Sequence, residues 1–145
     1  MYMNRLLIPL ATALCLTATN LLAQHVPDGK VPSAVKSALT AKYPSAKDVS
    51  WEKEKGNFEA NWGGASKEDN SVVFTPDGSF VEMVVATPVP SLPLAIPAYV
   101  KEHYPTSKIT EAGKITWPGG KTGYEAEVKG KDLVFDEKGN FIRID

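Results

Sequence analysis

The chain carries the same sequence pattern twice. Residues 31–47 are VPSAVKSALTAKYPSAK and residues 92–108 are LPLAIPAYVKEHYPTSK, and the two segments align without a gap at an offset of 61. The identical pairs in this alignment are Pro32/Pro93, Ala34/Ala95, Tyr43/Tyr104, Pro44/Pro105 and Lys47/Lys108. The same offset recurs further along the chain, at Phe74/Phe135, Gly78/Gly139 and Phe80/Phe141. A duplication of this length predicts two copies of one structural unit, which constrains the fold more than any single motif does.

The first 23 residues have the composition of a secretory signal peptide. Arg5 supplies a positive charge, residues 6–22 are mostly apolar, and Ala23 offers a small residue before Gln24. These features predict cleavage between Ala23 and Gln24, and a location in the periplasm or outside the cell. An uncleaved membrane anchor is the alternative, but several polar residues interrupt the apolar run.

Composition narrows the classes of function. Cleavage would remove Cys15, the only cysteine of the chain, so the mature protein could form no disulfide and no cysteine-ligated metal site. The whole chain has 16 basic and 17 acidic residues, which gives no basic excess for a nucleic-acid partner. The two histidines, His25 and His103, lack the spacing of a metal-binding or catalytic motif. We therefore expect no metal, no cofactor and no catalytic activity.

Each copy begins with a predicted helix. Val35 and Leu39 in the first copy, and Ile96 and Val100 in the second, have the spacing of one helical face. A Tyr-Pro pair follows each apolar stripe, and the residue before a proline avoids the helical conformation. The sequence therefore predicts that both helices end at this pair.

Strands are predicted after each helix. Apolar and polar residues alternate through residues 49–52, 58–62 and 124–128, a period typical of strands with one buried face. Each copy then has a hairpin whose turn contains a glycine, Gly78 or Gly139, a residue suited to a positive φ. We predict an α+β fold of two tandem repeats, each with one helix and a four-stranded antiparallel sheet, and with both helices on one face. The sequence leaves open whether the two sheets join.

The repeats also predict domain boundaries. The predicted segments are a signal peptide at 1–23, a loose N-terminal segment at 24–30, repeat 1 at 31–87 and repeat 2 at 88–145. Polar residues and a Pro-Asp-Gly turn favour a loose conformation for the N-terminal segment. Each repeat is only about 60 residues, a size that buries only about 60% of its surface and is marginally stable alone, so we expect the two halves to pack together.

These motifs resemble those of the PepSY-like family of secreted bacterial domains. The shared motifs are the helix ending in Tyr-Pro, the aromatic-Glu-Ala strand (Phe58-Glu59-Ala60 and Tyr124-Glu125-Ala126) and the Phe-x-x-x-Gly-x-Phe hairpin. Tandem members are similar in fold to the β-lactamase inhibitory protein, in which two helix-plus-four-strand halves join into a saddle that grips its partner. The resemblance implies binding rather than catalysis. This chain lacks the disulfides of that inhibitor, so a shared fold alone does not establish inhibition.

The candidate binding residues are polar side chains that alternate with the buried ones. If the helices cover the apolar side, these residues lie on the open face of the sheet and can orient a protein partner. A solvated polar face without a partner is the alternative interpretation. An open face offers no apolar pocket that would raise the pKa of a catalytic acid. The predicted set on this face is Glu59, Asn61, Glu82, Glu125, Glu127 and Arg143.

The three tryptophans have different predicted roles. Trp51 and Trp62 share the strand phase of the core, so we expect them to pack there. Trp117 precedes Pro-Gly-Gly in an insertion that only repeat 2 carries. It is either a plug at the base of the loop or an exposed anchor for a partner, since tryptophans dominate binding hot spots. We include Trp117 among the candidate partner-binding residues.

The predicted function is a secreted or periplasmic binding module without catalytic activity. Its most specific form would be an inhibitor of an extracytoplasmic enzyme, such as a protease or a β-lactamase. The alternative is an envelope protein that senses a small ligand or ion in a cleft between the repeats. We expect a protein partner in the cell envelope, no nucleic acid, and no membrane span after signal cleavage.

Overall fold

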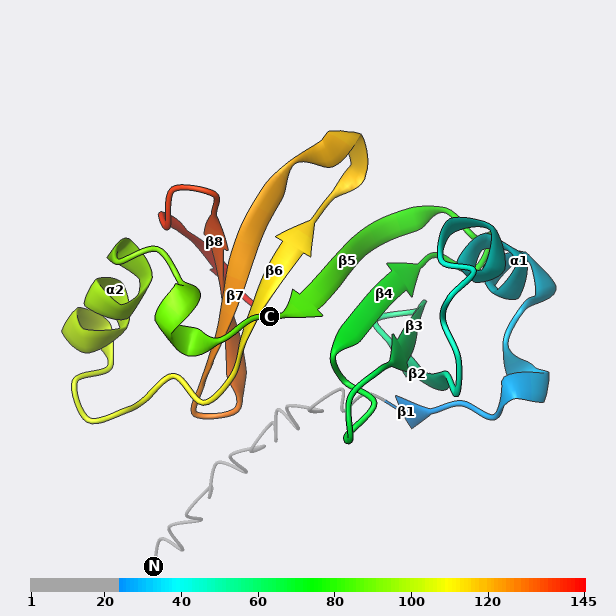
Figure 1. The fold of residues 1–145 in the computed structure, drawn as a ribbon, viewed down its shortest axis with the longest axis horizontal. Helices are drawn as coiled ribbons and strands as arrows, with labels where there is room; N and C mark the ends of the chain where they lie inside the picture. Colours follow the sequence, from blue (N-terminus) through cyan, green and yellow to red (C-terminus); the bar gives the residue numbers. More distant parts are fainter. Residues whose placement is uncertain (1–23) are drawn as a thin grey trace, which may run out of the picture.

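The computed structural model describes residues 24–145, so the predicted signal peptide at 1–23 lies outside it (Figure 1). The helical elements are α1 (Ser33–Lys42), α2 (Ala95–His103) and the short 3-10 turns η1 (Asp28–Lys30), η2 (Val89–Ser91) and η3 (Pro118–Gly120). The strands are β1 (Gln24–His25), β2 (Ser50–Glu54), β3 (Asn57–Trp62), β4 (Asn70–Phe74), β5 (Phe80–Ala86), β6 (Ala112–Thr116), β7 (Thr122–Val128), β8 (Lys131–Asp136) and β9 (Phe141–Ile144). Within residues 24–145, no helix has the length and apolar character needed to cross a membrane.

The two helices form where the repeated pattern predicts them. α1 buries Val35 and Leu39 on one face, and α2 buries the equivalent pair, Ile96 and Val100. In both repeats the tyrosine of the Tyr-Pro pair has left the helical conformation. The clash between proline and the preceding backbone accounts for both ends.

All nine strands form a single antiparallel sheet, in the order of the sequence from β1 to β9. Repeat 1 contributes β1 to β5 and repeat 2 contributes β6 to β9. β5 pairs with β6 from Met83↔Thr116 to Ala86↔Gly113, which joins the two halves side by side. Figure 1 shows β5 running from the half that carries α1 to the middle of the molecule, where it meets β6. We call this β5–β6 pairing the seam.

Each helix packs on the sheet of its own repeat. The core of repeat 1 includes Trp51 and Trp62, which are 3% and 8% exposed, so the prediction that they pack in the core is confirmed. The core of repeat 2 includes the buried Leu133 and Phe135 of β8. The two cores share no residue. Strand register places both on one face of the sheet, which confirms the predicted α+β fold.

The hairpin turns of the two repeats are tucked against the helices. Gly78 and Gly139 both have a φ of +86°. A Cβ atom at Gly78 would lie 2.7 Å from the carbonyl oxygen of Ala34 in α1, and one at Gly139 would lie 2.9 Å from the Cβ of Ala95 in α2. Glycine is therefore required at both positions for the backbone angle and for space.

Residues 24–30 are more regular than the loose segment that we predicted. β1 pairs with β2 at Gln24↔Lys53, and the amide of Val26 donates a 2.8 Å hydrogen bond to the carbonyl of Trp51. Val26 also packs against the core of repeat 1. The difference arises because the turn residues that favoured a loose segment come only after a short strand and an apolar contact.

Candidate binding surface on the open face

The open face is the side of the sheet opposite the two helices. The alternation along each strand places the polar partners of the core residues on this face. Glu125 of β7 lies between Gly113 of β6 and Val134 of β8. Val134 in turn lies opposite Arg143 of β9, while Glu59 of β3 belongs to the same face in repeat 1. The structure therefore brings residues from both repeats to one continuous surface.

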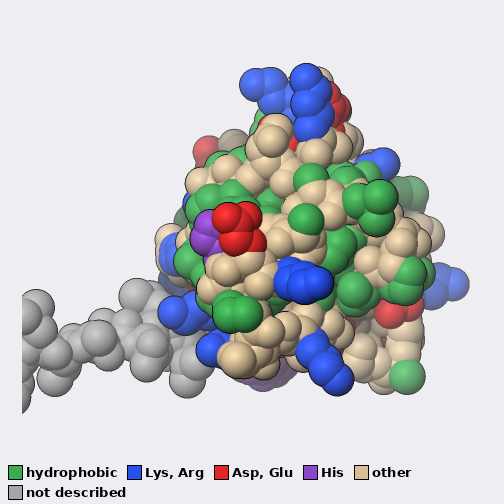
Figure 2. Space-filling view, turned by 90° about the vertical axis from the view of Figure 1, so that its left-hand side faces the viewer, with side chains coloured by type: hydrophobic (Ala, Val, Ile, Leu, Met, Phe, Trp, Pro, Cys, Tyr) green, Lys and Arg blue, Asp and Glu red, His purple; other side chains and the backbone are tan. Residues whose placement is uncertain are grey.

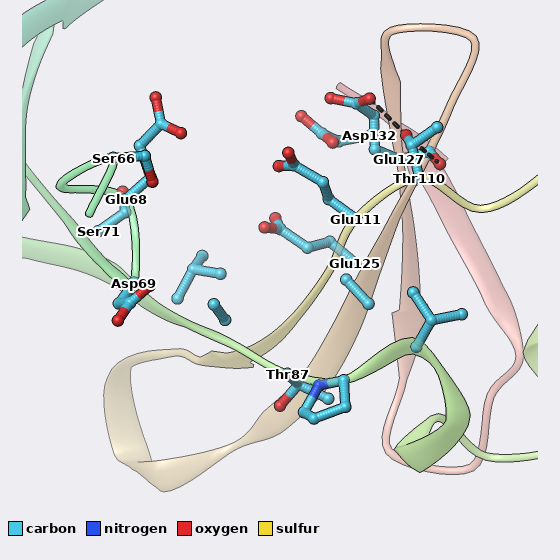
Figure 3. A pocket seen from close by; sticks show the side chains of 15 residues that line it. Ser66, Glu68, Asp69, Ser71, Thr87, Thr110, Glu111, Glu125, Glu127 and Asp132 are labelled. Carbon is cyan, nitrogen blue, oxygen red and sulfur yellow. Dashed lines mark hydrogen bonds between the residues drawn. The ribbon is translucent and has the colours of Figure 1, made fainter. Parts of the chain in front are cut away.

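Two adjoining hollows occupy the open face, with volumes of about 410 Å³ and about 310 Å³. Both are lined by residues from both repeats, and they share Ser71, Val84, Glu125 and Asp132. The larger lies between the loop at 63–69 and strands β6 to β8 (Figure 3). We call the larger one the acidic hollow and the smaller one the mixed hollow.

The acidic hollow is lined by carboxylates on two opposite sides. In Figure 3, Glu111, Glu125 and Asp132 lie along one wall, with Glu68 and Asp69 on the loop across the space. Within the described part of the chain, no lysine, arginine or histidine lines this hollow. Its carboxylates therefore face one another without a basic residue between them.

Glu125 lies where the two hollows meet, since it is one of the four residues that line both. Its carboxylate lies over the backbone of Gly113, where a Cβ atom would be 2.8 Å from Glu125 Oε1 and 2.5 Å from Val84 Cγ1. The missing side chain thus lets the carboxylate sink against the sheet. Burial, followed by the charge of Asp132, raises the pKa of Glu125 to about 8.

Two neighbouring carboxyl groups share this behaviour. Burial raises the pKa of Glu59, although a hydrogen bond from the Ser71 hydroxyl opposes the effect. Burial, followed by the charge of Glu127, also raises the pKa of Asp132. The open face therefore holds three carboxyl groups, from both repeats, whose ionised form is disfavoured.

The basic residues of the mixed hollow, Arg143 and Lys55, already have acidic partners. Arg143 Nη2 lies 2.7 Å from Asp145 and 3.9 Å from Glu82, and Lys55 Nζ lies 3.4 Å from Glu54 and 3.6 Å from Asp145. Across residues 24–145, none of the carboxylates that line the acidic hollow takes part in an ion pair. The negative charge of that hollow is therefore not compensated by the fold.

The predicted site residues have different surroundings. Glu59, Glu82 and Arg143 line the mixed hollow, Glu127 lines the acidic hollow, and Glu125 lines both. By contrast, Asn61 is 8% exposed and lines neither hollow.

Trp117 is half-buried and lies over Gly123, where a Cβ atom would be 2.5 Å from its ring. Its Nε1 donates a 2.9 Å hydrogen bond to Glu82. This packing corresponds to the plug alternative, and contact with a partner through the exposed part of the ring stays a prediction.

Sequence reasoning missed several residues of the surface. Asp132 could have been found, because the alternation through β8 gives it the same phase as Val134. The apolar Val134 concealed this, since an apolar residue on a strand suggests the core. Glu68 and Glu111 lie across the acidic hollow from each other only because the seam joins the repeats, and neither loop carries a signal for that proximity.

The other charged and aromatic groups lie elsewhere. His103 ends α2, where its ring stacks on Tyr99 with centroids 4.0 Å apart and its Nδ1 is 3.0 Å from the Tyr99 carbonyl oxygen. The end of the molecule that carries α2 shows hydrophobic side chains and lysines, with few acidic groups (Figure 2). Within residues 24–145, no group of three or more His, Asp or Glu side chains is arranged to hold a metal ion. What the open face offers is a hollowed surface of negative charge.

A comparison with known protein families matches most of the chain. A family model described as "Putative beta-lactamase-inhibitor-like, PepSY-like" matches residues 18–62 and 61–143. No curated protein matches the chain.

Several solved structures share the fold. A "putative periplasmic" protein from Bacteroides eggerthii aligns with a TM-score of 0.63 and 20% identity, over 79% of this chain and 88% of that one. A DUF2874 family protein from Bacteroides uniformis aligns with a TM-score of 0.62 and 20% identity, over 79% of this chain and 88% of that one. A BLIP-like protein from Bacteroides fragilis aligns with a TM-score of 0.56 and 23% identity, over 83% of this chain and 86% of that one. At these identities the likeness concerns the fold.

Proposed function

Because the chain belongs to the PepSY-like family, which is described as beta-lactamase-inhibitor-like, we propose that it is a non-catalytic binding module that acts outside the cytoplasm. Its partner is a protein of the cell envelope, held against the open face. The periplasmic description of a structure with the same fold supports this location. Inhibition of an extracytoplasmic enzyme is the form of binding that the family description favours.

The observation that carries this proposal is the set of uncompensated carboxylates on the open face. Glu59 comes from repeat 1 and Glu125 and Asp132 from repeat 2, and burial raises the pKa of all three. Burying carboxyl groups beside one another without a basic partner lowers stability, so folding alone gives no reason to keep them. A partner that inserts lysine or arginine side chains would supply the missing charge and gain orientation and association rate.

The shape of the surface favours a protein over a small ligand. The acidic hollow has a volume within the usual range for small-molecule sites, but such sites are mostly apolar. This one is lined mainly by carboxylates, hydroxyl groups and small side chains, and it opens into the mixed hollow. A protruding basic loop of a partner would fill both hollows at once.

A capture experiment tests the proposal. The protein would be immobilised and exposed to the envelope fraction of its source cells, and the captured proteins identified by mass spectrometry. The test variant is Glu59→Gln with Glu125→Gln, and the matched control is Glu102→Gln with Glu137→Gln. The control replaces the same number of carboxyl groups on exposed side chains, on α2 and in the β8–β9 turn. We expect one enzyme to bind the wild type and the control, and to be lost with the test variant.

Two results would contradict this function. One is equal capture by the test variant, which would move the site away from the open face. The other is no specific protein at all, together with a small cation that raises the Tm of the wild type but not of the test variant. That second result would support the alternative of an envelope sensor for a small ligand or ion.

A further inference from the structure

A chain of polar contacts crosses the open face between the two repeats. Trp117 Nε1 of repeat 2 donates a 2.9 Å hydrogen bond to Glu82 of repeat 1, and Glu82 lies 3.9 Å from Arg143 Nη2 of repeat 2. Arg143 lies 2.7 Å from Asp145, and Asp145 lies 3.6 Å from Lys55 Nζ in the β2–β3 turn of repeat 1. We call these five residues the inter-repeat brace.

The brace spans the seam, which neither hydrophobic core crosses from one repeat to the other. The two hydrophobic cores share no residue, and each helix packs on its own core. The seam is a ladder of short length, from Met83↔Thr116 to Ala86↔Gly113. The twist between neighbouring strands varies over about 25° among proteins, so such a ladder by itself permits a range of angles between the repeats.

The brace lies over apolar residues that belong to neither core. Ile115 and Val134 are each 1% exposed and are on the open face. Trp117 covers the backbone of Gly123, which lies opposite Ile115, and Arg143 lies opposite Val134. Hydrogen bonds to a charged group are stronger than neutral ones, and ion pairs joined in a network contribute more than isolated ones.

We propose that the inter-repeat brace fixes the angle between the two repeats and thereby sets the width of the acidic hollow. Glu82 and Arg143 are then positioning residues, whereas the sequence predicted that they contact the partner. The effect on binding rests on the proposed function, but the angle itself can be measured without any partner.

Distance measurement between the two helices tests the brace. Spin labels would be attached to the full chain at Ala41→Cys in α1 and Ala98→Cys in α2, both exposed positions, with Cys15→Ser to leave no other cysteine. Pulsed EPR then gives the distribution of distances between the labels. We expect a narrow distribution for this labelled parent and a broader, shifted one after Arg143→Met, because methionine keeps an apolar stem over Val134 but loses the charge.

Salt gives a second readout that a merely local packing role would not move. About 1 M NaCl should broaden the parent distribution toward that of Arg143→Met and leave the variant unchanged, because salt screens exposed ion pairs. The matched control is Lys36→Met, which breaks the 3.0 Å ion pair between Lys36 of α1 and Asp28 of η1 and should leave the distribution unchanged.

A folded Arg143→Met protein with the parent distribution would overturn the brace. If Arg143→Met does not fold, Lys55→Met removes the far end of the network and carries the same expectation. A distribution that broadens in Arg143→Met, without any captured partner, would contradict the proposed function and leave the brace standing. Distances that stay unchanged in Arg143→Met, together with normal partner capture, would contradict the brace and leave the proposed function standing. The two failures are therefore distinguishable.

Discussion

At the scale of single residues, Glu125 lowers the stability of the folded protein at neutral pH. Its pKa is about 8 in the fold, against an ordinary value of 4.5, because it is buried among other carboxylates. Between about pH 5 and pH 8 the folded protein therefore holds a proton that the unfolded chain has released. The free energy of unfolding should fall as the pH rises through this interval, since the native state binds more protons.

We therefore predict that Glu125→Gln stabilises the protein above neutral pH. The gain should be up to about 4 kcal/mol near pH 8 and vanish near pH 4, where the carboxyl is protonated in both states. Urea unfolding followed by circular dichroism, at several pH values, measures the difference. The exposed control Glu102→Gln should differ from the wild type by the same small amount at every pH. A Glu125→Gln stability curve that runs parallel to the wild-type curve would contradict a raised pKa of Glu125.

The burial of Glu125 could not be predicted from its own segment. The Glu-Ala-Glu alternation places its side chain on the open face, as the structure has it. Its depth depends on Gly113, a residue on another strand whose missing Cβ leaves room for the carboxylate. Single-sequence patterns report the direction of a side chain but not what lies beneath it.

At the scale of elements, the hairpin turns join strand and helix within each repeat. Gly78 has a positive φ and also lies against α1, whereas Gly56 in the β2–β3 turn has the same φ of +86° with nothing within 4 Å of a Cβ atom. Gly29 in η1 has neither constraint. Comparing these three glycines therefore distinguishes the effect of a positive φ from the effect of steric contact with α1.

Alanine substitution of these glycines should give a graded series. We expect Gly29→Ala to change stability by less than about 0.5 kcal/mol, Gly56→Ala to cost about 1 kcal/mol, and Gly78→Ala to cost about 2 to 3 kcal/mol. Thermal unfolding of the three variants measures the order. Equal losses for Gly56→Ala and Gly78→Ala would mean that the contact with α1 contributes nothing.

Elements with strong local signals were predictable, and those that depend on distant pairing were not. The Tyr-Pro ends of α1 and α2, the strand phases and the turn glycines all followed from sequence, because each depends on backbone preferences within a few residues. β1 was missed because two polar residues carry no strand pattern, and they pair only because β2 offers an edge. The family resemblance, which rested on the same local motifs, is confirmed.

At the scale of the whole molecule, the seam turns two small repeats into one sheet. The duplication is evident in the sequence, but which strands would meet is not, because pairing between the repeats joins residues far apart in the chain. The partners of Glu82 and Arg143 were unpredictable for the same reason. The Trp117–Glu82 hydrogen bond and the Arg143–Glu82 contact each join groups from two repeats, and the seam sets the relative position of those repeats.

We predict that repeat 1 does not fold cooperatively without repeat 2. A chain of residues 24–91 would expose the edge of β5 and would bury only about 60% of its surface, as is usual at this size. Circular dichroism and amide proton dispersion would compare it with residues 24–145. A sharp thermal transition in the isolated repeat would show instead that the seam adds shape without adding stability.

The connector between β5 and α2 makes the pairing of the two repeats independent of protein concentration. Two separate copies of such a repeat could meet only by collision, and their pairing would weaken as protein became scarce. Within one chain, a segment that includes η2 holds the second repeat beside the first, so its effective concentration is set by the connector and not by the number of molecules present. A complete open face is therefore present on every molecule, however low the protein concentration.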